Sequence, residues 1–389
     1  MEGIPLAATP LNKGYLINSN RYYLQVFIDK ILGVITKERQ VELRTPARIL
    51  ISNSGHLGDI IISTALIPVL KDVYPNCKIG FLIGSWAHCV LEGHPDISWI
   101  HHNDVRQLNR AQINRFKKFS IHLKSWWHSL HEIRKLDYDI AIELSPYFTN
   151  SIILLKQAKI PTTIGYDSGG YGPLLTKRLN WQMRDQHIAE YHYALACLLP
   201  KVADYHRPLH YHLHSNSQQS TGDKTAGKYI VVHPGAGERN KEWDSLKWRQ
   251  LVQKLAENGY SVMLTGHGAR EYAINEKIGL DVKNCQNLCN KLNWKEFVSL
   301  VAGARLYIGV DSAGGHVAAS FDTPSITLMT GINNIQHWRP LGKNARVIYK
   351  SDDCFPCYEA KGCDRMNCIM DISIDDLFSE CLEICNQSY

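Results

Sequence analysis

A glycine-rich turn joins an apolar segment to a run of small residues near position 310. The segment Leu306–Val310 is followed by Asp311-Ser312-Ala313-Gly314-Gly315-His316 and then by Val317-Ala318-Ala319-Ser320. This order predicts a strand that ends in a tight turn from which a helix begins. The first N–H groups of such a helix lack partners within it, and with the helix dipole they favour a phosphate. A tight strand–helix turn alone would also explain the glycines.

A second turn of this kind lies in the other half of the chain. It reads Ser52-Asn53-Ser54-Gly55-His56-Leu57-Gly58-Asp59, after the strand-like residues 47–51 and before an apolar helix that is expected to run to about Tyr74. Asp59 is expected at the carboxyl end of a parallel sheet, where open α/β folds bind ligands. A carboxylate at this place either caps its helix or serves as a general base, and the sequence leaves both interpretations open.

The rest of the chain alternates between strand and helix patterns. Strands are predicted at 47–53, 79–84, 138–144, 162–166, 229–233, 261–265, 306–310, 325–329 and 346–349, and helices at 59–74, 113–135, 186–199 and around 248–255. The last of these helices has Trp248, Leu251, Val252 and Leu255 on one face, and Gly259 just past its end is expected to cap it. This alternation predicts an α/β protein with parallel sheets covered on both faces. A dehydrogenase would show the same alternation, but no strand is followed by the G-x-G-x-x-G turn and later acidic residue of a dinucleotide site.

Length and composition are those of a globular protein with two domains. The chain has 389 residues, of which 44% are hydrophobic and 21% charged. It contains neither an apolar run of about 18 residues nor a basic start followed by an apolar core, so we expect a cytoplasmic protein. The net charge of +6 and the 18 histidines indicate an anionic partner. Without a recognisable nucleic-acid motif, a phosphorylated glycolipid or a nucleotide diphosphate is expected rather than nucleic acid.

Two amphipathic segments stand apart from the alternating pattern. The first belongs to an N-terminal extension, residues 1–45, and has Leu24, Phe27, Ile28, Ile31 and Ile35 on one face. In the second, residues 116–133, basic residues separate the apolar side chains of Phe116, Phe119, Leu123, Trp126, Leu130 and Ile133. Packing against the domain core is the favoured interpretation of both segments. Docking on an anionic membrane or an acceptor lipid is the alternative.

Four of the eleven cysteines lie within fifteen residues, at Cys354, Cys357, Cys363 and Cys368. Four thiolates can hold one tetrahedral zinc or iron ion, and such a site would be structural because no position stays open for a substrate. Four reduced thiols in a packed loop are the alternative. Cys381 and Cys385, four residues apart on the predicted last helix, are expected to face the core. The absence of a secretory signal argues against a disulfide framework.

The two turns, together with His233-Pro234-Gly235-Ala236-Gly237 and Lys241-Glu242-Trp243, resemble the ADP-heptose–lipopolysaccharide heptosyltransferases of glycosyltransferase family 9. The resemblance covers about residues 46–385. It implies the α/β GT-B architecture, in which two Rossmann-like parallel-sheet domains face each other across a cleft. The implied divisions are an acceptor domain at 46–205, a linker at 206–227, a nucleotide-sugar domain at 228–350, and a cysteine-rich loop with a C-terminal helix at 351–389.

This resemblance also implies an inverting transfer of heptose from ADP-heptose to an acceptor hydroxyl, with no cofactor needed for catalysis. Asp59 stands at the place of the family's proposed catalytic base, and Lys241 at the place of a lysine that contacts the diphosphate. The turn Asp311-Ser312-Ala313-Gly314-Gly315-His316 would hold the rest of the donor, although the family usually has glycine where this chain has Ala313. Gly235 and Gly237 would let the backbone approach the donor, unless turn geometry alone requires them. His316 could equally be a buried, hydrogen-bonded core residue.

The acceptor and the partners remain open at this stage. The acceptor implied first is the lipopolysaccharide core, with an anionic glycolipid, a related glycan, a protein or a small molecule as alternatives. Peripheral contact with the inner face of the inner membrane, and oligomer formation, are further expectations. Similar cysteine loops occur in the family, and the branch that glycosylates autotransporter proteins holds iron there. The alternative of another class is a non-catalytic nucleotide-binding scaffold with a metal loop.

Overall fold

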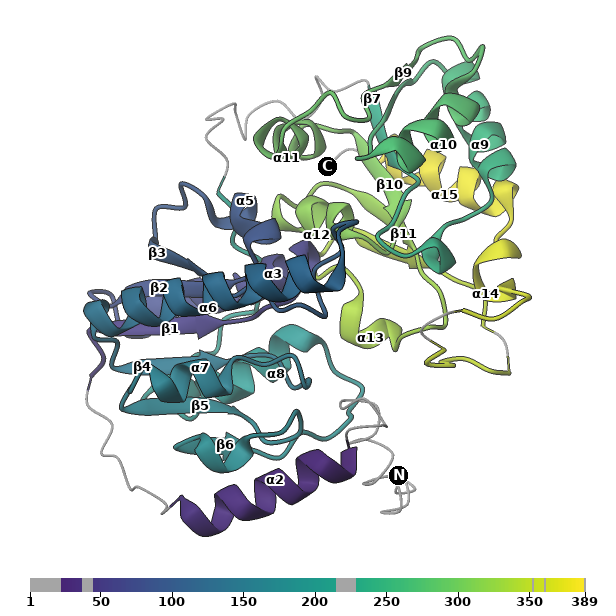
Figure 1. Cartoon of the computed structure of the whole chain (residues 1–389). Coiled ribbons are helices and arrows are strands. Elements are labelled where there is room, and N and C mark those ends of the chain that lie inside the picture. Colours follow the sequence, from purple (N-terminus) through teal and green to yellow (C-terminus); the bar gives the residue numbers. More distant parts are fainter. Residues whose placement is uncertain (1–21, 37–44, 215–228, 352, 360–361, 388–389) are drawn as a thin grey trace. The chain divides into compact units, whose positions relative to one another are not determined.

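The computed structural model describes residues 22–36, 45–214, 229–351, 353–359 and 362–387. The chain forms two compact units: unit 1 comprises Met1–Arg184 and Ile188–His214, and unit 2 comprises Asp185–His187 and Ser215–Tyr389. Each unit contains a six-stranded parallel sheet (Figure 1). Residues 1–21 and 37–44 of the predicted N-terminal extension, and 215–227 of the predicted linker, lie outside the described residues.

Unit 1 has the strand order β3-β2-β1-β4-β5-β6, which is the order typical of a Rossmann fold. Its strands are β1 (Arg48–Ser52), β2 (Lys78–Ile83), β3 (Ile97–His102), β4 (Ile140–Glu143), β5 (Thr162–Tyr166) and β6 (Lys177–Leu179). Its helices are α2 (Tyr22–Ile35), α3 (Leu57–Ser63), α4 (Leu66–Val73), α5 (His88–Leu91), α6 (Arg115–Leu136), α7 (Ile152–Gln157) and α8 (Ile188–Ala196), with 3₁₀ turns η3 (Ser85–Ala87), η4 (Gly172–Leu174) and η5 (Val202–Asp204).

The core of unit 1 forms because its central strands are apolar on both faces. Leu50, Leu82 and Ala141 of the sheet pack with Leu130 of α6 and Leu154 of α7. The predicted helix 59–74 is in fact two helices, α3 and α4, which meet at Thr64 and Ala65. Pro68 explains this correction: it has no N–H to donate, and its ring excludes a regular helical position for the carbonyl of Thr64.

Unit 2 has the strand order β12-β11-β10-β7-β8-β9. If β7 is counted as its first strand and the sheet is read from the β9 edge, this is the order of unit 1, so the two units share one topology. Its strands are β7 (Tyr229–His233), β8 (Ser261–Leu264), β9 (Cys285–Asn287), β10 (Leu306–Val310), β11 (Ser325–Leu328) and β12 (Ala345–Ile348). Its helices are α9 (Ser245–Glu257), α10 (Ala269–Gly279), α11 (Trp294–Ala302), α12 (Ala313–Ser320), α13 (Ile335–Trp338), α14 (Asn367–Met370) and α15 (Ile374–Asn386), with the 3₁₀ turn η6 (Arg239–Lys241).

Helices α9 and α15 cover one face of the unit 2 sheet. The α9 side chains predicted to share a face, Trp248, Leu251, Val252 and Leu255, are all fully buried. Gly259 ends this helix with a left-handed φ of 86°, as predicted from its position. Cys381 and Cys385 of α15 lie in the same core, which confirms their predicted orientation.

The two amphipathic segments pack only in part. Helix α2 is held to unit 1 through polar groups, since the Asp29 carboxylate accepts hydrogen bonds from Gln25 (3.0 Å) and from the Tyr171 N–H (2.8 Å). Its apolar side chains Leu24 and Phe27 are about 60% exposed, so the packing interpretation is wrong for this face. Helix α6 buries Leu130 and Ile133 but exposes its first turns. In the described part of the chain, none of the helices combines the length and apolarity needed to span a bilayer.

Candidate functional site

Asp59 lies in the first turn of α3, directly after the central strand β1 of unit 1. Its Oδ2 accepts a hydrogen bond from the backbone N–H of His56 at 2.7 Å, which closes a capping box at the start of the helix. A Cβ on Gly55 would lie 2.5 Å from the Asp59 Cβ, so only glycine lets the turn pass this close to the side chain. The capping role is therefore real, and it fixes the Asp59 carboxylate at the carboxyl end of the sheet.

A buried polar network lies beside this turn, between the ends of β1 and β4. The Glu143 side chain is fully buried and accepts hydrogen bonds from the Ser52 hydroxyl (2.8 Å) and from the N–H groups of Ser151 (2.9 Å) and Ser145 (3.1 Å). Burial raises the pKa of Glu143 to about 7, although these hydrogen bonds oppose the shift. The network joins the end of β1, from which the turn of Asp59 starts, to the end of β4.

Lys241 and Asp311 bring together the two turns that were predicted to hold a donor in unit 2. Lys241 ends η6, in the loop that follows β7, and Asp311 follows β10 directly. Their side chains form an ion pair with an Nζ–Oδ2 distance of 2.6 Å, and both are largely but not completely buried. Strands β7 and β10 are neighbours at the point where the strand order reverses, which is where open α/β sheets bind ligands.

Helix α12 starts at this same point. Ser312 is its N-cap, but within the described residues the Ser312 side chain makes no capping hydrogen bond to the first turn. A Cβ on Gly314 would lie 2.1 Å from the Tyr307 hydroxyl, and one on Gly315 would lie 2.8 Å from Thr327 Oγ1. These two glycines are therefore required by packing against β10 and β11. Ala313 begins the helix, so its N–H, like those of Gly314 and Gly315, belongs to the first turn.

His316 is buried on the following turn of α12. Burial lowers the pKa of His316 to about 4. The Asp311 carboxylate opposes this shift, and the Lys241 ammonium group adds a smaller lowering of the pKa. The ring is therefore neutral at physiological pH and lies near both members of the ion pair. This agrees with the buried histidine that the sequence allowed.

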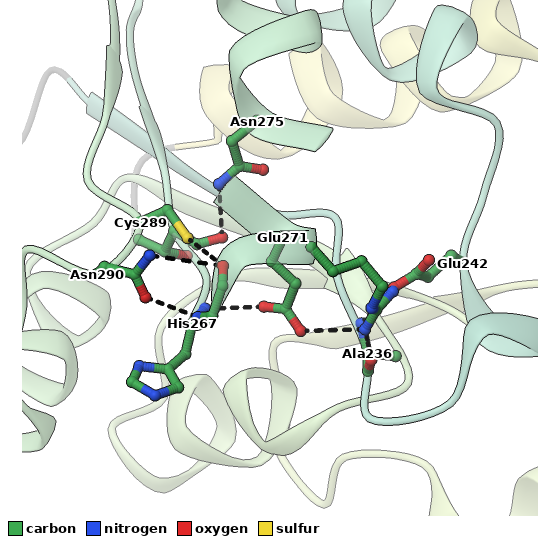
Figure 2. A network of polar contacts seen from close by, with 10 residues as sticks. Ala236, Glu242, His267, Glu271, Asn275, Cys289 and Asn290 are labelled. Carbon is green, nitrogen blue, oxygen red and sulfur yellow. Dashed lines mark hydrogen bonds and ion pairs between the residues drawn. The ribbon is translucent and has the colours of Figure 1, made fainter. Parts of the chain in front are cut away.

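A polar network braces the loop that carries Gly235, Gly237 and Lys241 (Figure 2). Arg270 of α10 forms an ion pair with Glu242 and donates to the carbonyl of Ala236 at 2.6 Å. Glu271 accepts from the N–H of His267 at 2.9 Å, and its side chain occupies the space that a Cβ on Gly235 would need. Gly237 is exposed in the same loop. Arg270 and Glu271, like Glu143, were not identified from the sequence.

The four loop cysteines are neighbours in unit 2. Burial, and to a smaller extent the nearby thiols of Cys357, Cys363 and Cys354, raises the pKa of Cys368. Within the described residues no three of the four sulfurs lie within 4.8 Å of one another. A tetrahedral zinc site has Zn–S bonds of about 2.3 Å and therefore needs sulfurs about 3.8 Å apart. The thiol donors fit zinc or iron chemically, and the loop would have to tighten to hold the ion.

Comparisons with known proteins agree with these features. The model of glycosyltransferase family 9 (heptosyltransferase) matches residues 126–367. Lipopolysaccharide heptosyltransferase 3 of Escherichia coli K12 is 26% identical over 305 residues, which cover 74% of this chain and 83% of that protein. The structure of E. coli ADP-heptose lipopolysaccharide heptosyltransferase II has a TM-score of 0.68 at 22% identity and covers 87% of this chain and 98% of its own.

A second structure is similar over most of the chain. It is the iron-containing dodecameric glycosyltransferase TibC from enterotoxigenic E. coli H10407, with a TM-score of 0.50 at 12% identity. The similarity covers 90% of this chain and 81% of TibC. At such identities the likeness shows the fold alone, and with the two Rossmann-type sheets it confirms the predicted α/β GT-B class.

Proposed function

Because the chain belongs to glycosyltransferase family 9, the heptosyltransferases, we propose that it transfers a heptose from ADP-heptose to a hydroxyl of the lipopolysaccharide core. The observation that supports this donor best is the ion pair of Lys241 with Asp311, which joins two turns at the strand-order reversal of unit 2. A cation and the start of a helix at one place suit a diphosphate. The Asp311 carboxylate would orient Lys241 and accept a hydrogen bond from the ribose.

In the proposed reaction, the acceptor oxygen attacks the anomeric carbon of the donor while the bond from that carbon to the phosphate oxygen breaks. ADP leaves with the bonding electron pair, and the proton of the acceptor hydroxyl passes to the Asp59 carboxylate. Attack opposite to the leaving group inverts the anomeric centre. Lys241 and the N–H groups of Ala313, Gly314 and Gly315 would stabilise the charge that develops on the departing diphosphate.

The cysteine loop would hold a structural zinc or iron ion through Cys354, Cys357, Cys363 and Cys368. This proposal is supported by the three thiols that lie near Cys368 and by the similar fold of TibC, an iron-containing glycosyltransferase. The loop contacts the turn that carries Lys241, since a Cβ on Gly362 would lie 2.9 Å from the Cβ of Asn240. An ion in the loop would thus support the phosphate-binding turn without taking part in the chemistry.

The start of α6 would contact an anionic membrane surface at the inner face of the inner membrane, where a lipid-linked acceptor is held. Phe116, Phe119 and Leu123 are exposed there, and Lys117 and Lys118 lie beside them on the same helix. Exposed apolar and basic side chains on one helix are typical of binding at a lipid interface.

The experiment that tests the function uses the purified chain, ADP-heptose and lipopolysaccharide lacking outer heptose. We expect ADP release that depends on the acceptor, together with a mass gain of one heptosyl residue on it. UDP- and GDP-linked sugars serve as donor controls. ADP-heptose binding without transfer to lipopolysaccharide, protein or small-molecule acceptors would instead indicate a non-catalytic scaffold.

A further inference from the structure

A cluster of imidazoles and a carboxylate lies in unit 1 away from the turn of Asp59. His94 and Asp96 come just before β3, and His212 lies in the segment that follows η5. One ligand atom from each of the three side chains lies within 4.8 Å of the others. In the described part of the chain, this is the only such group of three or more histidine, cysteine or acidic side chains.

The hydrogen bonds of His94 fix its tautomer in the way a metal ligand requires. Its Nε2–H donates to the carbonyl of His212 at 3.0 Å, because a carbonyl can only accept. Its Nδ1 accepts from the backbone N–H of Asp96 at 3.2 Å, so Nδ1 carries the lone pair that an ion needs, and a bound ion would replace this hydrogen bond. Metal-binding histidines usually donate their other N–H to a carbonyl or carboxylate in this manner.

The separation between His212 and Asp96 also fits two ligands of one ion. His212 Nε2 lies 3.3 Å from Asp96 Oδ2, slightly longer than the usual N–H···O hydrogen bond of about 2.7–3.2 Å. Two ligand atoms on a tetrahedral ion with bonds of about 2.0–2.1 Å are about 3.3 Å apart. The rings of His94 and His212 are 5.0 Å apart and that of His214 is 6.2 Å from His94, so a third imidazole is at hand.

We propose that His94, Asp96 and His212 bind a divalent transition-metal ion of the zinc type, with His214 or water in the fourth position. Two imidazoles and one carboxylate are ligands that zinc prefers. The ion would be structural, because His94 and Asp96 precede β3 and therefore lie at the amino end of the sheet, opposite the turn of Asp59. The His212 N–H also bonds Thr64 at the end of α3, at 2.9 Å. The ion would fasten the segment around residue 212 to the body of unit 1.

The test is a titration of the chelator-treated full chain with Co²⁺, which reports ligand type through its absorption. A site of nitrogen and oxygen ligands gives visible bands without the near-ultraviolet sulfur-to-metal transition that a cobalt ion in the cysteine loop would show. We expect one saturable site of the first kind. The variants Asp96→Asn and His212→Ala each remove a proposed ligand. Their Co²⁺ affinity should fall by at least about 10–100-fold, which is the loss typical of removing a residue that only orients a metal ligand. Both side chains are more than a third exposed, so these variants should fold.

His210→Ala is the matched control, because His210 is an exposed histidine of the same segment whose ring bonds the carbonyl of Pro208 and is not part of the cluster. This variant should bind Co²⁺ like the unmodified chain. The proposal is overturned if Co²⁺ shows only the sulfur transition, if no saturable binding occurs, or if Asp96→Asn and His212→Ala bind it unchanged.

Discussion

Lys241 is the residue for which structure and proposed chemistry connect most closely. Its ammonium group is paired with Asp311 and lies beside the start of α12. If it contacts the diphosphate, Lys241→Met removes a charge-assisted hydrogen bond, which is worth about 1.5–3 kcal/mol, so ADP affinity should fall by about 10- to 100-fold. Calorimetry with ADP measures this loss. Lys283→Met, a change of an exposed lysine near the start of β9, is the control, and equal ADP affinity of both variants would refute the assignment.

Glu143 makes stability depend on pH, and the sign follows from its environment. Burial raises its pKa from an unfolded value of 4.5 to about 7, so the folded protein favours the protonated form. The free energy of unfolding should therefore fall by about 3 kcal/mol as pH rises from about 4.5 to about 7, and then stay constant for this group.

Urea unfolding at about pH 5 and about pH 8 measures this dependence. In Glu143→Gln the contribution should vanish, so the variant's unfolding free energy should fall less across this range than that of the unmodified chain. Glu190→Gln, which changes an exposed glutamate, should leave the dependence as it was. An unchanged pH dependence in Glu143→Gln would show that Glu143 stays ionised when buried.

At the scale of elements, the start of α12 depends on glycine because the helix lies against β10. Gly314→Ala would place a methyl group 2.1 Å from the Tyr307 hydroxyl. Overpacking of this kind costs about 1–3 kcal/mol. Thermal unfolding should show a lower Tm for Gly314→Ala. Gly33→Ala on α2, where the added Cβ would lie 4.0 Å from Pro173 Cγ, should not show this loss. A Tm unchanged by Gly314→Ala would mean that α12 shifts freely and cannot present a fixed set of N–H groups.

Elements with a strong local signal were predictable, whereas those set by distant contacts were not. The alternation of strands, the α9 face and its Gly259 end follow from spacing alone. Pro68 indicates the division of α3 from α4, although the apolar pattern of 59–74 predicts a single helix. The exposed face of α2 could not be predicted, because its attachment through Gln25 and Asp29 depends on Tyr171, more than a hundred residues away. The same holds for Arg270 of α10, which donates to the carbonyl of Ala236 in the loop after β7.

For the candidate site, the sequence located the turns but not the supporting residues. Gly55 and Gly235 were expected to allow sharp turns or close approach of a ligand, and the structure shows that Asp59 and Glu271 fill the space beside them. The partner of Lys241 lies seventy residues along the chain, so pattern alone could not reveal their ion pair. Glu143 carries a readable signal, since it is an acidic residue inside a predicted apolar strand, 138–144.

At the scale of the whole molecule, the two halves share one topology and differ in what their loops carry. The turn after β1 presents a carboxylate, and the turns after β7 and β10 present a lysine and the start of a helix. The central claim is that these groups act in one reaction, with the base from unit 1 and the donor-binding groups from unit 2. The claim requires that catalysis and donor binding respond separately to substitutions in the two units.

Single-turnover transfer by Asp59→Asn tests this claim most directly. The asparagine oxygen can still accept the His56 N–H, so the capping contact and the fold should persist. Loss of a general base should lower the transfer rate by about 10²–10⁴-fold while the Kd for ADP stays unchanged. A transfer rate equal to that of the unmodified chain would contradict the account, because Asp59 would then be a helix cap alone.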